Sequence, residues 1–281
     1  MIYLLMWSDE TEKLKMIKFS KKKLACVLCG IFITICLLGW EVYLYHEVNA
    51  YRSERISAQA GNNPFQSKKI AFLGDSITYG YDPNNKCKQM KNPWVKQVGE
   101  KLHVRECKNY GVNSASVMNI KGTKMAAIDY YQKMDEDIDI LGVMIGINDA
   151  YRQYPLGQFS DRTPDTFYGA LHLMWQRILK RYPPETGKKV FFIMYPQYDV
   201  LPFWPEYKKA LYEVAEYYSV PICDLSKEMG MSPYADDQYQ YWPEEAYKGQ
   251  EGFHSAHPSQ KGADLYADVI ANYMWRQFGV E

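Results

Sequence analysis

Short apolar runs alternate with segments of helical periodicity through most of the chain, beginning near residue 69. The runs of strand length cover residues 69–74, 104–110, 138–147, 189–195 and 220–225. The helical segments cover residues 93–102, 123–134, 163–181, 205–218 and 259–278, the third of them starting at a Thr-Pro-Asp cap. Strands that alternate with helices imply βαβ crossovers. We therefore predict an α/β fold, a three-layer α/β/α sandwich around a mostly parallel five-stranded sheet, with 138–147 as a central strand covered on both faces.

The N-terminal part of the chain follows a different pattern. Residues 24–40 carry no charge, and four lysines stand just before them. Continued through residue 45, this run reaches the about 20 residues that a membrane-spanning helix needs, and the lysines favour a cytoplasmic N-terminus. We predict a cytoplasmic segment (1–23), a transmembrane signal-anchor (24–45), a polar linker or stem (46–68) and the main domain (69–281). A signal peptide cleaved near Ala50 and a start at Met16 are the alternatives.

Charge and cysteine usage narrow the class of protein. The chain has 33 basic and 33 acidic residues, so no field of one sign argues for nucleic-acid binding. Of the six cysteines, only Cys87, Cys107 and Cys223 lie outside the apolar N-terminal run. Three cysteines do not form a disulfide framework, and a single bridge between Cys87 and Cys107 is the one pairing to consider.

Residues suited to acyl chemistry follow the predicted strands. GDS at 74–76, NYG at 109–111 and GIND at 146–149 each come at the end of a strand, and HPSQKG at 257–262 opens the last helix. The carboxyl ends of parallel strands share one edge of a sheet, so these blocks can converge. A serine hydroxyl needs a positioned base such as imidazole to act as a nucleophile, and the oxyanion that results needs fixed N–H donors.

In this order the four blocks resemble the SGNH hydrolases, the GDSL family of esterases and lipases, over about residues 69 to 275. The resemblance implies that Ser76 is the nucleophile and His257 the base. It also implies an oxyanion hole made by the backbone N–H groups of Ser76 and Gly111 and by the side-chain amide of Asn148. Each residue alone has a plainer interpretation, Ser76 as a helix cap and Asn148 as part of a turn, and only the combination favours catalysis. We expect Asp149 to organise its loop.

One position departs from the family pattern. The family usually has an aspartate three residues before its histidine, and this chain has His254 there. Two assignments follow. His254 could be the base with Glu251 as the orienting acid, or His257 could be the base, held by His254, a backbone carbonyl or Glu251. We favour His257, because Pro258 and Gly262 match the helix that follows the family's histidine.

The resemblance implies a serine esterase that works through an acyl-enzyme and needs neither cofactor nor metal. Aromatic-rich loops at 195–204 and 234–247 flank the expected site and suit sugar rings or acyl chains, although they could equally cover the core. With an outward-facing anchor in the cell membrane, we predict hydrolysis of O-acetyl esters on an extracellular glycan, an acetylated surface polysaccharide. The alternatives are a lipid or aryl esterase, an O-acyltransferase, and a catalytically inactive surface-binding module.

Overall fold

A computed structural model of the chain divides into two compact units, Met1–Asn62 and Asn63–Glu281. The structure describes residues 3–6, 15–18, 26, 30, 39 and 40 of the first unit, and 63–82, 85, 88–120, 123–196, 203–230, 240–243 and 256–279 of the second. Residues 63–68, which we assigned to the linker, belong to the second unit. There Phe65 is buried and meets Trp275 edge-on, with ring centroids 5.0 Å apart.

The first unit contains a small antiparallel sheet that the sequence analysis did not predict. Its strands are β1 (Tyr3–Met6) and β2 (Lys15–Lys18), with Tyr3 opposite Lys18. Nearly all of the predicted membrane anchor, residues 24–45, lies outside the described residues. Within the described part of the chain, no helix is long and apolar enough to span a bilayer. The anchor therefore stays a prediction.

The second unit is built on one five-stranded parallel sheet. Its strands are β3 (Lys69–Gly74), β4 (Glu106–Gly111), β5 (Ile140–Met144), β6 (Lys189–Met194) and β7 (Ile222–Asp224), and their order across the sheet is β4-β3-β5-β6-β7. All five predicted strands are present, and the predicted α/β class is confirmed. The third strand is shorter than its apolar run, because Ile147 already belongs to the next helix.

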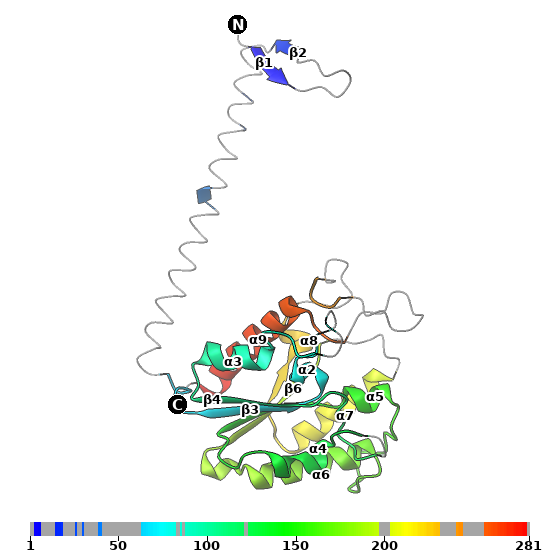
Figure 1. Cartoon of the computed structure of the whole chain (residues 1–281). Helices are drawn as coiled ribbons and strands as arrows, with labels where there is room; N and C mark the ends of the chain where they lie inside the picture. The colour runs from blue at the N-terminus through cyan, green and yellow to red at the C-terminus, as the bar shows by residue number, and fades with distance from the viewer. Residues whose placement is uncertain are drawn as a thin grey trace. The chain divides into compact units, whose positions relative to one another are not determined.

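Helices cover both faces of this sheet. They are α2 (Ser76–Tyr79), α3 (Trp94–Leu102), α4 (Ala127–Tyr130), α5 (Ile147–Tyr151), α6 (Phe167–Arg181), α7 (Trp204–Tyr217), α8 (Leu225–Glu228) and α9 (Gln260–Phe278), with 3-10 turns η1 (Tyr131–Lys133) and η2 (Pro184–Thr186). Figure 1 shows α3 and α9 on one face of the sheet and α4, α6 and α7 on the other. The short helices α2 and α5 begin at the carboxyl ends of β3 and β5.

Two helix predictions need correction. The helix predicted at 123–134 is reduced to α4 and η1, because the backbone before α4 pairs with Ser116, whose N–H donates to the carbonyl of Met125. Helix α6 begins later than the Thr-Pro-Asp start at 163. Its cap is Thr166, whose hydroxyl accepts the N–H of Gly169 at 3.2 Å.

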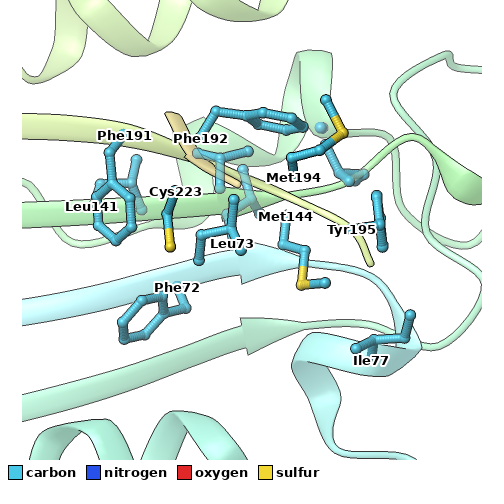
Figure 2. Close-up of a cluster of buried hydrophobic side chains, with 14 of the residues drawn as sticks. Phe72, Leu73, Ile77, Leu141, Met144, Phe191, Phe192, Met194, Tyr195 and Cys223 are labelled. Carbon is cyan, nitrogen blue, oxygen red and sulfur yellow. The ribbon is translucent and has the colours of Figure 1, made fainter. Parts of the chain in front are cut away.

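The core is formed where side chains from neighbouring strands meet the helices. Phe72 on β3 meets Trp94 of α3 edge-on at 4.9 Å between ring centroids, and Phe191 of β6 at 6.3 Å. Figure 2 shows this cluster, with Phe72 and Phe191 near one another and Tyr195 beyond the end of β6. The indole N–H of Trp94 also donates to the carbonyl of Ile77 at 2.9 Å, so this one side chain ties α3 to the turn after β3.

An ion cluster holds together the amino-terminal ends of three strands. The ammonium group of Lys69, at the start of β3, lies 2.7 Å from Asp135, 2.7 Å from Asp137 and 3.3 Å from Glu106. Hydrogen bonds to these carboxylates raise the pKa of Lys69. The cluster lies at the end of β3 opposite Ser76, so it serves the sheet and takes no direct part in the chemistry.

We expect Trp94→Ala to lower the free energy of unfolding by about 3–5 kcal/mol, because it opens a cavity and removes the bond to Ile77. Chemical denaturation followed by circular dichroism measures this. Phe203→Ala is the control, since Phe203 is 42% exposed and its loss should cost within about 0.5 kcal/mol. Equal effects of the two substitutions would contradict this account of the core.

Candidate active site

In the turn after β3, the backbone of Gly74 lies very close to the side chain of Thr78. A Cβ atom on Gly74 would lie 2.1 Å from the hydroxyl oxygen of Thr78 and 2.4 Å from the carbonyl oxygen of Met144. Glycine is required here by this close approach. Asp75 then caps α2, with its carboxylate accepting the N–H of Ile77 at 2.8 Å. Because Asp75 is the cap, the hydroxyl of Ser76 is available for another partner.

That partner is His257. The Oγ of Ser76 lies 2.7 Å from Nε2 of His257, a hydrogen-bond distance between residues 181 positions apart. Which atom donates depends on the imidazole tautomer. With Nε2 unprotonated, the hydroxyl donates to it, which is the arrangement that a general base needs.

The helix that follows His257 is firmly docked. Ser259 caps α9 by accepting the N–H of Gly262 at 3.3 Å, as the predicted helix start requires. The side chain of Gln97 on α3 donates to Asp264 at 2.7 Å, and Lys101 forms an ion pair with Asp268 at 2.7 Å. These contacts fix the start of α9 relative to the sheet, and so fix the histidine. The other candidate base, His254, and the candidate orienting acid, Glu251, lie outside the described residues, and their roles stay predictions.

A buried carboxyl group directly precedes Ser76 in the chain. Asp75 is fully buried and accepts a short hydrogen bond from the hydroxyl of Tyr195, at the end of β6. Burial raises the pKa of Asp75 to about 6, against the opposing effects of these hydrogen bonds and of the nearby His257. Tyr195 was not predicted as a site residue, because a tyrosine at a strand end carries no distinctive pattern.

The GIND block contacts the loop that follows β4. The side-chain amide of Asn148 donates one of its two N–H hydrogens to the carbonyl of Ala115 at 2.8 Å. The carboxylate of Asp149 accepts the N–H groups of Val117 at 2.8 Å and Met118 at 3.0 Å. Asp149 therefore organises a loop, as predicted, although the loop is the one after β4. Burial raises the pKa of Asp149 to about 7.

Gly111 has a packing role in this structure. Its N–H donates to the side-chain oxygen of Asn109 at 2.8 Å, and a Cβ atom on it would lie 2.1 Å from the backbone nitrogen of Tyr79. The predicted part of Gly111 in an oxyanion hole stays a prediction. Further along the same loop, Ser114 adopts a left-handed conformation (φ 66°), and its N–H donates to no acceptor among the described residues. Nothing in the sequence marks Ser114, since glycine or asparagine is the usual residue in that conformation.

Among the described residues of the two aromatic loops, most of the large rings belong to the core. Tyr195 and Trp204 of the first loop, and Trp242 of the second, are fully buried, so these rings belong to the core. Phe203 remains exposed. The bridge considered between Cys87 and Cys107 is not formed, because Cys107 is a free thiol that donates to the carbonyl of Val95 at 3.2 Å.

A serine hydroxyl on an imidazole at the carboxyl edge of a parallel sheet, with an asparagine following the neighbouring strand, is typical of a serine hydrolase. The family model for GDSL-like lipases and acylhydrolases matches residues 72–265. The chain therefore belongs to this family, and it is an SGNH-type ester hydrolase, as the sequence motifs predicted.

Solved structures show the same fold. A protein from Lactobacillus plantarum superposes with a TM-score of 0.61 at 23% identity, covering 76% of this chain and 99% of that one. A protein from Bacteroides ovatus, proposed to be a GDSL-like lipase, has a TM-score of 0.55 at 18% identity and covers 75% of this chain and 99% of its own. No curated protein sequence matches the chain. At these identities the likeness establishes the fold and leaves the substrate open.

We expect Asp149→Asn to remove a pH dependence of stability. The native carboxyl keeps its proton to about pH 7, whereas the unfolded one loses it near 3.8. Wild-type stability should therefore fall relative to the variant as the pH rises from about 4 to about 7, and the difference should then level off. Denaturation at a series of pH values measures this. Asp165→Asn, at an exposed position, is the control and is measured over the same pH series. A flat difference for Asp149→Asn would contradict the assignment.

Proposed function

We propose that this protein hydrolyses esters through an acyl-enzyme on Ser76, with His257 as the general base. The observation that carries the proposal is the 2.7 Å contact between Oγ of Ser76 and Nε2 of His257. Ser76 lies near the start of the domain's sequence and His257 lies near its end. Each stands beside a helix cap, Asp75 for α2 and Ser259 for α9. Two independently fixed groups at hydrogen-bond distance are the geometry that nucleophilic catalysis needs.

The reaction follows from this geometry. Oγ of Ser76 attacks the ester carbonyl carbon while its proton passes to Nε2 of His257. The tetrahedral oxyanion collapses, the C–O bond to the alcohol breaks, and the imidazolium returns the proton to the leaving oxygen. Water then attacks the acyl-serine, with His257 taking its proton and giving it back to Ser76 as the acid departs.

The oxyanion needs donors that are fixed before the reaction. We assign one to the second amide hydrogen of Asn148, whose first hydrogen is held by Ala115. The backbone N–H of Ser76 is the second. For the third we favour the N–H of Ser114 over that of Gly111, because the Gly111 N–H is already donated to Asn109. Each such donor typically lowers the barrier by about 2.7–4 kcal/mol.

The catalytic assignment predicts that Ser76→Ala and His257→Ala each lower kcat for p-nitrophenyl acetate by at least about 1,000-fold. A fluorophosphonate probe should label the wild type at Ser76. His254→Ala is the matched control. In the favoured assignment His254 does not carry the proton of Ser76, so this variant should keep a clearly higher kcat than His257→Ala.

The outcomes separate the alternatives. Full activity of His257→Ala together with an inactive His254→Ala would transfer the base to His254. Failure of the probe to label the folded protein would support the catalytically inactive binding module.

We further propose that the substrate is an O-acetyl ester on a glycan at the cell surface, and that the apolar segment at 24–45 anchors the enzyme in the membrane with its domain outside. The basic flank and length of that segment support the anchor, and the exposed ring of Phe203 at the start of α7 supports contact with a sugar ring. The family by itself supports an ester hydrolase and does not specify the substrate.

Incubation with O-acetylated polysaccharide should release acetate, and the Ser76→Ala variant should release none. Acetate can be measured enzymatically and the polysaccharide followed by NMR. Turnover confined to long-chain lipid esters would contradict the glycan proposal. Ester consumption that accelerates on adding a deacetylated glycan, with acetate moved onto the sugar, would favour the acyltransferase.

A further inference from the structure

A tyrosine ring lies against the imidazole of the proposed base. The ring centroids of Tyr81 and His257 are 4.3 Å apart, and the ring planes are inclined by 37°. The two rings are therefore tilted relative to one another, and their separation is well inside the about 6 Å at which an aromatic ring attracts a cation. His257 thus has Ser76 at one nitrogen and an aromatic face against its ring.

The backbone fixes Tyr81 relative to the nucleophile. Helix α2 is a single turn that ends at Gly80, which has a left-handed conformation (φ 85°). The N–H of Tyr81 donates to the carbonyl of Ser76 at 2.9 Å, and that of Gly80 to the carbonyl of Ile77 at 3.2 Å. This pair of bonds is a Schellman motif, which places Tyr81 directly after the turn that begins with Ser76.

A second set of contacts holds the turn from outside. Tyr81 pairs with Gln89 in an antiparallel bridge, and the side chain of Gln89 donates to the carbonyl of Tyr79 at 2.7 Å. The N–H of Met90 donates to the carbonyl of Gly80 at 2.8 Å. The aromatic wall and the nucleophile therefore belong to one rigid turn, and His257 docks against both.

We propose that Tyr81 is a positioning residue that fixes the plane of the His257 ring and stabilises its protonated form while the ring carries the proton of Ser76. The proposal rests on the catalytic roles proposed above for Ser76 and His257. When the hydroxyl proton moves to Nε2, the ring becomes cationic beside the face of Tyr81. Attraction between that charge and the aromatic face is therefore greater in the transition state than in the resting enzyme, which is the condition for lowering a barrier.

The chain has a particular need for such a residue. The position three residues before His257 holds His254, so the usual carboxylate is missing there. The buried Asp75 interacts electrostatically with His257, and Glu251 and His254 lie outside the described part of the chain. Tyr81 restricts the orientation of the imidazole through ring packing and makes no hydrogen bond to do so. This packing acts together with the electrostatic attraction between Asp75 and the imidazolium.

The test compares Tyr81→Leu with Tyr81→Phe in the full-length protein, on p-nitrophenyl acetate. The leucine variant loses the aromatic face, and its kcat should fall by about 3- to 30-fold with KM changed less than about twofold. The acid side of its kcat/KM–pH profile should move to lower pH by about half a unit, because the cationic ring has lost stabilisation. The phenylalanine variant keeps the face and should match the wild type in both readouts.

Controls keep the result interpretable. Tyr217→Leu removes an exposed tyrosine whose ring contacts Phe159 and His172, and it should leave kcat and the pH profile unchanged. Thermal melting of each variant separates misfolding from loss of positioning, and a Tyr81→Leu protein that melts early is replaced by Tyr81→Met.

Wild-type kcat and an unmoved pH profile in the folded leucine variant would overturn the role of Tyr81. A tenfold loss shared by Tyr81→Phe would also overturn it, since that would point to the hydroxyl. Ser76→Ala run in the same assay distinguishes the two levels: if it stays active, the proposed catalytic serine has failed, whatever Tyr81 does.

Discussion

The hydrogen bond between Ser76 and His257 is the interaction on which the site depends, because it joins the first turn of the domain to the start of its last helix. Its 2.7 Å length is set by elements that pack for other reasons. Helix α2 is held close to the sheet by two glycines with no room for a Cβ atom, and α9 is held on α3 by a hydrogen bond and an ion pair. The catalytic geometry is thus a by-product of how the outer helices pack on a parallel sheet.

Two buried carboxyl groups shape the walls of the site without facing substrate. Asp75 lies under the nucleophile turn, with Tyr195 as its partner, and Asp149 gathers two backbone N–H groups of the loop after β4. Burial alone makes an unpaired carboxyl costly, and these hydrogen bonds offset that cost. Asp75 directly precedes the proposed nucleophile Ser76, and Asp149 directly follows the proposed oxyanion donor Asn148. A short motif such as GDS or GIND therefore encodes a functional side chain together with the group that supports it.

The strands and the pairing of motifs with strand ends were predictable, because continuous apolar runs and turn residues are local properties of the chain. The helix start after His257 was also predictable, since Pro258 and Gly262 mark it, whereas the choice of base between the two histidines stays a prediction. The roles of Tyr81 and Tyr195 were not predictable, because both arise from contacts with residues far along the chain. Tyr81 contacts His257, and Tyr195 donates a hydrogen bond to Asp75. The turn that ends at Gly80 does not indicate which side chain the ring of Tyr81 contacts. The aromatic residues of the two loops were left with two interpretations for a related reason: composition alone does not distinguish a ring that lines a surface from one that fills the core.

The position of His257 at the start of the final helix has a consequence for biosynthesis. The ribosome synthesises the chain from the amino terminus, so the turn that holds Ser76 and the sheet can form before the imidazole of His257 has emerged. The hydroxyl of Ser76 lacks a base until α9 has docked on α3. On the proposed mechanism, hydrolytic activity should therefore appear only after α9 has been synthesised and has docked on α3.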